Sequence, residues 1–177
     1  IGVFSSDLAY RRGLEIPTFS GETQKRLRKF FPTPGNSMAN PLDTGSPALP
    51  VETVQTLARE ILTREPVDVL IIIMLLRTLE VELPSFYRMN GMEPPPVGSY
   101  LRSLVGTLSR LRGETGKDVV MVFENRAYMP EDVSVEAVSR EMRGLFQAEG
   151  IAVYPSTERA LRGIWHASRA MTHKKAS

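Results

Sequence analysis

The feature that most limits the fold is a run of eight apolar residues, VLIIIMLL, at positions 69–76. A run of this length is far too short to cross a bilayer as a helix. It contains no polar residue that would alternate with the apolar ones, so it lacks the pattern of a strand with one solvated face. The run therefore predicts a strand buried on both faces, as strands of parallel sheets are.

Two further strands and several amphipathic helices are expected around this run. The strands are KDVVMVFE at 117–124 and the shorter IAVYP at 151–155. Apolar residues at helical spacing predict helices near 51–61, 101–111, 138–149 and 156–171. Because strands alternate with helices, the sequence predicts an α/β fold, a flavodoxin-like doubly wound parallel sheet with helices on both faces and right-handed crossovers. We expect its first strand upstream of residue 1.

The remaining segments are expected to be short or irregular. A helix over 4–12 should end at Gly13, followed by an extended segment at 14–19. Ser20 should cap a helix that runs to about Phe31, where the prolines at 32 and 34 end it. Residues 77–96 are expected to be irregular because EPPP at 93–96 forbids regular structure.

Composition narrows the class of protein. At 177 residues the chain suits one domain, 1–177, which we expect to be a fragment of a larger multidomain chain because it begins at Ile1, almost inside a helix. It has no cysteine, which removes disulfides, thiolate catalysis and cysteine-ligated metals. With 22 basic and 20 acidic residues we expect no nucleic acid partner. No signal peptide or membrane segment is visible, and we expect a cytoplasmic protein.

The loop NSMANPLDTGS at 36–46 is the first candidate site. Loops of this length inside compact domains are uncommon and often functional. Asn40 and Asp43 could hold a backbone or ligand group, with Gly45 closing the loop. The alternative is a plain Pro–Asp turn that caps the helix starting near Pro50. The residues alone favour that simpler interpretation.

The first residues, IGVFSSD, are the second candidate. A helix N-terminus offers unpaired N–H groups and a positive dipole end to an anion, here at Gly2, Val3, Ser5 and Ser6. Simple capping of the helix by Ser5, Ser6 or Asp7 explains the same residues equally well.

Other polar residues give weaker indications. The basic run KRLRK at 25–29 is expected to be a solvated helix face. His166 and His173 have no paired carboxylates nearby in sequence and are expected to be surface or packing residues. Glu124 and Asn125 end a buried strand and should lie at the edge of the sheet where ligands gather. No metal site is expected.

Several motifs together resemble one family. GLEIPTFSGETQKRLRKFFP, followed by NPLD and later by GIAVYPSTERALRGI, is similar to the ADP-forming acyl-CoA synthetases of the succinyl-CoA synthetase superfamily. The similar part is the flavodoxin-like domain equivalent to the C-terminal domain of the succinyl-CoA synthetase β subunit. ANPLDTG resembles that family's Ala-Asn-Phe-Leu-Asp-Val-Gly loop, with Pro41 in place of phenylalanine.

The resemblance implies a role in phosphoryl transfer. In that family a phosphohistidine of a neighbouring flavodoxin-like domain lies between two helix N-termini, and residues 2–6 would supply one of them. Asn40 and Asp43 would organise the adjacent loop, with Asp43 accepting hydrogen bonds, for instance from Ser5 or Ser6.

The same resemblance implies that the chemistry needs other domains. CoA-binding, histidine-bearing and ATP-grasp domains are the expected partners, and ATP or ADP, Mg and CoA the cofactors of the intact enzyme. None is expected to bind this chain alone, which should contain no catalytic residue and be inactive in isolation. The alternative is a non-catalytic regulatory or protein-interaction domain that retains the fold. Self-association as a homo-oligomer stays open.

Overall fold

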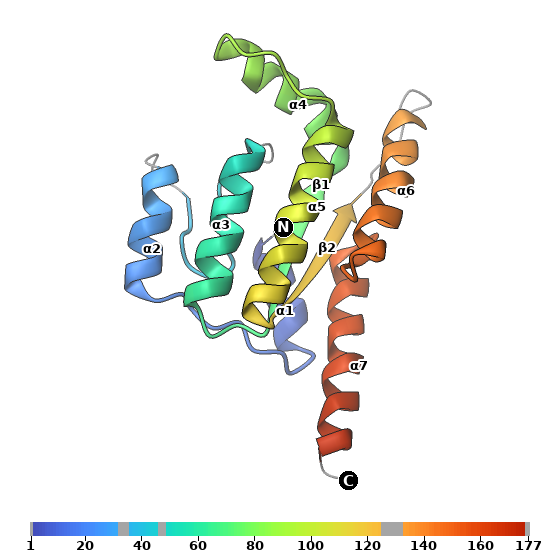
Figure 1. Ribbon diagram of the computed structural model, residues 1–177. Helices are drawn as coiled ribbons and strands as arrows, with labels where there is room; N and C mark the ends of the chain where they lie inside the picture. The colour runs from blue at the N-terminus through green and yellow to red at the C-terminus, as the bar shows by residue number, and fades with distance from the viewer. Residues whose placement is uncertain (1, 32–35, 46–48, 125–132, 176–177) are drawn as a thin grey trace.

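The computed structural model describes residues 2–31, 36–45, 49–124 and 133–175. Seven α-helices, one 3-10 helix and three strands lie in this part of the chain (Figure 1). In chain order they are α1 (Gly2–Tyr10), α2 (Gly21–Leu27), η1 (Arg28–Phe30), α3 (Val51–Arg64), β1 (Val69–Leu75), α4 (Leu76–Met89), α5 (Val97–Thr115), β2 (Asp118–Glu124), α6 (Val133–Ala148), β3 (Ala152–Tyr154) and α7 (Thr157–Lys175).

The three strands form one parallel sheet in the order β1-β2-β3. Val69 pairs with Asp118 at the start of β1 and Leu75 with Glu124 at its end, while β3 pairs with the middle of β2. This confirms the predicted α/β class with a flavodoxin-like arrangement and all three predicted strands. The apolar runs located the strands correctly, but the expectation that residues 69–76 form a strand buried on both faces is wrong. β1 lies at the edge of the sheet and is only partly buried apart from Met74, whereas the central strand β2 is buried on both faces.

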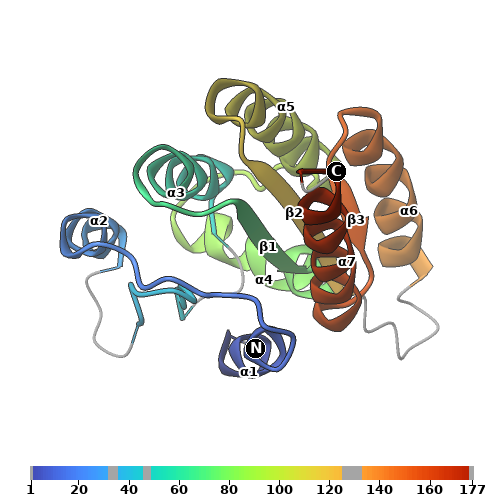
Figure 2. The ribbon, with the colours of Figure 1, turned by 90° about the horizontal axis from the view of Figure 1, so that it is seen from below.

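The central strand β2 divides its side chains between two helix layers. Val119, Met121 and Phe123 pack into the large core shared with α3, α4, α5 and α6, whereas Val120 and Val122 pack toward α7. Figure 2 shows α7 on one side of the sheet and α3, α5 and α6 on the other. Alternate residues of one strand thus hold helices on both faces, as expected from the side-chain period of two.

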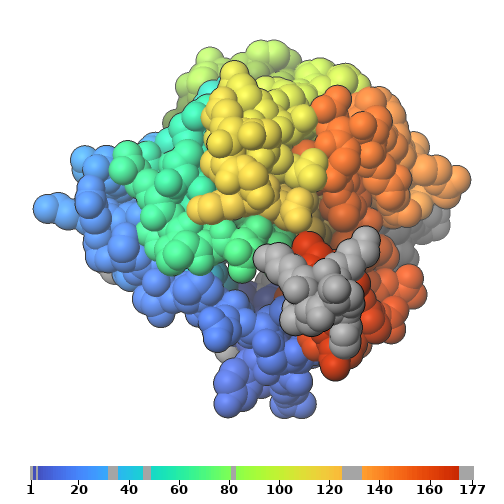
Figure 3. All heavy atoms as spheres, turned by 60° about the horizontal axis from the view of Figure 1, so that its bottom comes forward, coloured from blue at the N-terminus to red at the C-terminus, as the bar shows by residue number. Residues whose placement is uncertain are grey.

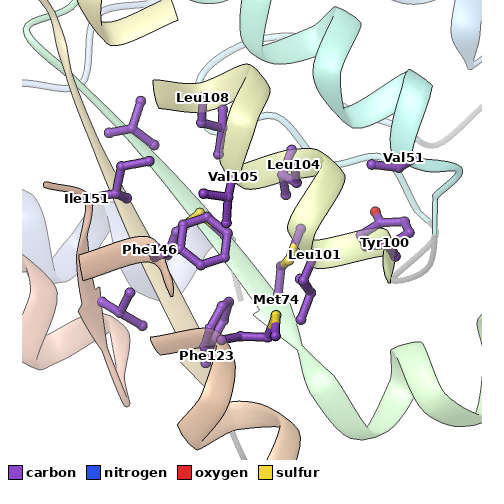
Figure 4. Close-up of a cluster of buried hydrophobic side chains, with 14 of the residues drawn as sticks. Val51, Met74, Tyr100, Leu101, Leu104, Val105, Leu108, Phe123, Phe146 and Ile151 are labelled. Carbon is purple, nitrogen blue, oxygen red and sulfur yellow. The ribbon is translucent and has the colours of Figure 1, made fainter. Parts of the chain in front are cut away.

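The large core is held by aromatic and branched side chains between the sheet and α5 (Figure 4). Leu101, Leu104 and Leu108 are fully buried along one face of α5. The rings of Phe123 and Phe146 meet edge to face, with centroids 5.6 Å apart and an interplanar angle of 79°. Burial of this kind contributes about 1.5–3 kcal/mol for each large apolar side chain.

A smaller apolar cluster lies beside the large core and matters for the loop described below. It joins α2 and the residues around it to α3, and we call it the small cluster. Its buried members are Phe19, Leu27, Phe31, Met38, Leu57, Ile61 and Val67.

The expectation that residues 77–96 are irregular is wrong for most of the segment. Residues 76–89 form α4, with Pro84 inside the helix. Leu76, Leu79 and Leu83 recur at helical spacing on one face and are almost completely buried. This burial outweighs the lost backbone hydrogen bond and the crowding that a proline introduces. Only residues 90–96, a turn followed by the segment that includes EPPP, lie outside helices and strands as predicted.

The smaller expectations for the helices hold. The Oγ of Ser20 caps α2 by accepting a hydrogen bond from the Thr23 N–H at 3.2 Å. Ser156 accepts one from the Arg159 N–H at 3.4 Å at the start of α7. No helix in the described residues has the length and apolar character needed to span a membrane.

The packing of α7 on β3 gives a test of the fold. A Cβ added at Gly163 in α7 would overlap the phenol oxygen of Tyr154 and lie 2.7 Å from its Cζ. Gly163→Ala should therefore lower the free energy of unfolding by about 1–3 kcal/mol through overpacking. Gly144→Ala in α6 is the control, because that Cβ would meet nothing within 4 Å. Alanine there should stabilise the helix by up to about 1 kcal/mol. Urea unfolding of both variants measures the difference, and equal effects would contradict the packing.

Candidate functional site

The loop over residues 36–45 is closed by its own backbone. The Ser37 N–H donates to the Asp43 carbonyl oxygen at 3.1 Å, and the Asp43 N–H donates to that of Ser37 at 2.9 Å. The exposed carboxylate of Asp43 accepts a hydrogen bond from the Gly45 N–H at 3.0 Å. Asp43 thus forms the local turn that the simpler interpretation predicted. It does not cap α3, whose N-cap is Pro50 without a side-chain hydrogen bond.

Three contacts hold this loop against the rest of the molecule. Met38 is 1% exposed and belongs to the small cluster. The Asn40 Nδ2 donates to the carbonyl oxygen of Pro17 at 3.1 Å. Pro41 lies so close to Gly2 that a Cβ on that glycine would be 3.3 Å from the proline Cγ. The tip of the loop is therefore fixed beside the first turn of α1.

An open depression of about 690 Å³ lies next to these contacts. Its walls come from α1, the irregular segment that follows it and the loop. The lining residues are Ser6, Tyr10, Gly13, Leu14, Glu15, Ile16, Pro17 and Asn40. Two of the predicted site residues, Ser6 and Asn40, therefore face the same hollow. We call this hollow, with the loop and the first turn of α1, the candidate site.

The hydrogen bond of Ser6, in the first turns of α1, differs from the expected one. The Ser6 hydroxyl donates to the carbonyl oxygen of Gly2 at 3.1 Å, within the helix. That hydroxyl proton is thus used inside α1 and does not reach Asp43 as expected. The side chain of Val3 lies outside the described residues. The first turn of α1 contains no acidic residue, so its positive end is not neutralised within the helix.

The buried carboxylate of Glu65, which the sequence analysis did not identify, holds the end of the segment at 14–19 that leads to the candidate site. Glu65 is 2% exposed, and its Oε1 and Oε2 accept hydrogen bonds from the Ser20 hydroxyl at 2.7 Å and the Ser20 N–H at 3.1 Å. The Lys117 ammonium donates to the carbonyl oxygens of Leu62 at 2.7 Å and of Glu65 at 2.5 Å. This cluster ties the start of α2 to the end of α3 and so anchors the C-terminal end of the segment at 14–19.

The same contacts set the pKa of Glu65. Burial alone raises the pKa, but hydrogen bonds from Thr23 and Ser20, with the Lys117 charge, outweigh it and bring the pKa below its ordinary value of 4.5. Nothing in the sequence marks Glu65 as buried, because it ends an amphipathic helix where glutamates are usually solvated.

The carboxyl edge of the sheet contains one further polar pair. The Thr157 Oγ1, at the start of α7, donates to the Glu124 Oε1 at 3.0 Å. Glu124 thus lies at the predicted edge, while Asn125 lies outside the described residues. His166 is exposed on α7, and the side chain of His173 is not described. Within the described part of the chain no three histidine, aspartate or glutamate side chains gather as a metal site would require.

The fold is thus that of an α/β domain whose candidate site combines a helix N-terminus with an anchored loop. No protein-family model matches the chain, and no curated protein matches it. The assignment to a family therefore stays a proposal that depends on the motifs and the site.

Gly45 gives a test of the loop geometry. Its φ is +64°, and an added Cβ would overlap the side-chain oxygen of Asn36. Gly13 is the control, because it has a φ of +70° but open space around it. Alanine at Gly13 therefore introduces backbone strain alone, whereas alanine at Gly45 introduces backbone strain and a steric clash. Gly13→Ala should cost about 1–2 kcal/mol and Gly45→Ala clearly more. Hydrogen exchange should then accelerate over 36–45 in the Gly45 variant alone. Unchanged exchange in that loop would contradict the geometry.

Glu65 gives a test in acid. A lowered pKa means that its stabilising contribution is fully present above about pH 4.5 and is lost as the pH falls through the folded-state value. Glu65→Gln should cost about 1.5–3 kcal/mol at pH 7, because hydrogen bonds to a charged group are lost. Below pH 4.5 the free energy of unfolding of Glu65→Gln should also decrease less steeply with falling pH than that of the wild-type protein. Urea unfolding of both proteins between pH 7 and pH 3 measures this, and parallel curves would overturn the assignment.

Proposed function

We propose that this chain is a flavodoxin-like domain of an ADP-forming acyl-CoA synthetase. The overall reaction is acid + CoA + ATP ⇌ acyl-CoA + ADP + phosphate, through a phosphohistidine on a neighbouring domain. In this proposal the domain contributes the N-terminus of α1 and the 36–45 loop to the phosphohistidine pocket. The observation that carries it is the contact of Pro41 with Gly2, which brings the NPLD loop to the first turn of α1.

Electrostatics support a phosphoryl group at this place. The backbone N–H groups of a helix's first turn have no partner within the helix, and they favour an anion together with the dipole. Donors fixed in advance stabilise developing charge without having to reorganise. Asp7, the nearest acidic residue of α1, pairs with Arg11 at 3.0 Å. The Asp43 carboxylate is turned to the Gly45 N–H of its own loop.

Other domains must then supply the reacting groups. The proposal assigns CoA, the nucleotide with its Mg, and the phosphorylated histidine to the CoA-binding, ATP-grasp and histidine-bearing partners. It assigns no catalytic role to His166, which lies exposed on α7. A cytoplasmic location belongs to the same proposal, since a cysteine-free α/β chain suits a reducing compartment.

One observation is compatible with a second candidate as well, a non-catalytic interaction domain. Phe4 and Tyr10 on α1 are 64% and 81% exposed, although large apolar side chains usually bury much of their surface. A synthetase would cover them with a neighbouring domain, and an interaction domain would cover them with an unrelated partner. Activity of the full-length protein separates these two functions.

Asn40 provides the test of the proposed function. In the full-length synthetase, Asn40→Ala should slow phosphorylation of the histidine by ATP at least about tenfold. The reason is that losing the Pro17 hydrogen bond, worth about 0.5–1.5 kcal/mol, also lets the loop move away from α1. The KM for the acid should not change. Transfer of ³²P from labelled ATP and formation of acyl-CoA are the measurements.

Asn90→Ala is the matched control. Its Nδ2 makes a hydrogen bond of the same type, to the Phe86 carbonyl oxygen at 2.8 Å, at the end of α4. This variant should phosphorylate at the wild-type rate. A wild-type rate in Asn40→Ala, or no acyl-CoA from the full-length protein with any short acid, would reject the proposed role.

A further inference from the structure

Basic residues form a row along one face of α7. Arg159, Arg162, His166 and Arg169 follow one another at intervals of three, four and three residues. Residues three and four apart lie on the same face of a helix, about 5–6 Å from each other. All four side chains are exposed. The spacing continues in the sequence to His173. We call these four described residues the basic row.

The arginines of this row differ from most other arginines of the protein. Elsewhere in the described residues arginines pair with carboxylates, for example Arg64 with Glu60 at 2.8 Å and Arg102 with Glu141 at 3.1 Å. No described carboxylate forms an ion pair with a member of the row. Arg169 instead lies over the ring of Trp165, with its guanidinium carbon 4.9 Å from the ring centroid. Among the described residues, the three guanidinium groups of the row thus have no carboxylate partner, and their side chains are exposed.

The C-terminal segment that contains the row also has an excess of basic residues that the rest of the chain lacks. Residues 159–177 contain five of the 22 basic residues and none of the 20 acidic ones. Residues 1–158 therefore hold 17 basic against 20 acidic side chains. The near-neutral total conceals a basic helix attached to a mildly acidic body. Like charges three or four residues apart destabilise a helix by about 0.2–0.5 kcal/mol per pair, so the row does not serve the stability of α7.

The position of α7 leaves this face accessible. In Figure 1 the C-terminal part of α7 extends past the ends of the other helices. Its apolar side is occupied, because Ala160 and Leu161 are buried and Ile164 packs against the sheet. The opposite side carries the four exposed side chains of the basic row. Figure 3 shows this end of the molecule, where α7 lies beside α1.

We propose that the basic row is a docking surface for an acidic face of a partner protein, namely a helix that presents carboxylates at matching spacing. Arginine suits such a partner because its planar guanidinium binds a carboxylate through two parallel hydrogen bonds. From Arg159 to Arg169 the row spans about 15 Å at 1.5 Å per residue. A partner helix of three turns covers this length.

Two other anionic partners fit the structure less well. A membrane surface would bind an amphipathic helix through an apolar face that enters the lipid, and that face of α7 is packed against the sheet. A nucleic acid duplex presents phosphates over a surface far wider than one helix, and the mildly acidic body beside α7 would repel them. A narrow acidic stripe on a protein touches the row alone.

The test uses two helical peptides of one composition. One peptide carries glutamates at i, i+3, i+7 and i+10 along one face, and the other distributes the same glutamates around the helix. Trp165 is the chain's single tryptophan, so its fluorescence reports binding directly at the row. The striped peptide should bind at least about threefold more tightly than the dispersed one at 50 mM salt. Both affinities should fall at 300 mM salt.

Charge reversal of arginines in the basic row tests whether the striped peptide binds at the row. Arg162→Glu/Arg169→Glu should weaken binding of the striped peptide at least about fivefold. Arg88→Glu/Arg140→Glu makes the same charge change on α4 and α6 and should leave the affinity within about twofold. Circular dichroism must first show that both variants keep the wild-type helix content, and Gln replacements at the same positions substitute for any variant that does not.

Three results would overturn the proposal. The first is equal affinity for the striped and dispersed peptides. The second is an equal loss of binding in the row variant and the control variant. The third is tighter binding of the chain to phosphatidylserine vesicles or to duplex DNA than to the striped peptide at the same salt concentration, which would make the partner a lipid surface or a nucleic acid.

Discussion

The rest of the structure depends on the central strand β2, which is buried on both faces. Its five residues from Val119 to Phe123 are almost wholly buried, alternately toward the large core and toward α7. This requires apolar side chains on both faces and a helix layer on each side. The hydrogen bonds of β2 to β1 on one edge and to β3 on the other leave its backbone paired along both sides. The helix α1, which borders the candidate site, packs against α7, and α7 in turn packs against this strand.

The sequence specified the layers better than the loops, for a physical reason. Burial on both faces leaves a continuous apolar run, and helices against a sheet repeat their apolar residues at a period near 3.6, so both patterns are local. The helix α4 was not predicted, because the prolines near it were given more weight than the apolar pattern. The burial of its three leucines together outweighs the cost of the one proline inside the helix. Expectations for the termini of the chain and for other domains lie beyond what a local pattern can specify.

The candidate site depends on contacts between residues far apart in sequence. The hydrogen bond from Asn40 to Pro17 joins residues 23 positions apart, and that from Ser20 to Glu65 joins residues 45 apart. Sequence alone indicated that Asn40 and Asp43 belong to an unusual loop. It could not show that Asp43 serves its own turn while Asn40 fixes the loop to a neighbouring segment. Asp43 pairs with Ser37 in an antiparallel bridge and accepts a hydrogen bond from Gly45, whereas Asn40 lies between the two bridge residues and donates to Pro17.

The helix α7 connects the two surfaces for which we propose roles. At its start, Glu158 pairs with Arg12 just beyond α1 at 3.5 Å, so α1 and α7 are joined near the candidate site. An acidic residue in the first turn of a helix complements the helix dipole, and basic residues do so in the last turn. Glu158 follows this preference, and so do Lys174 and Lys175 by their place in the sequence. Arg159 and Arg162 oppose it, because they lie near the positive end. Neither the helix dipole nor an ion pair among the described residues accounts for the charges of Arg159 and Arg162. Carboxylates of a partner protein would supply the ion pairs for both arginines.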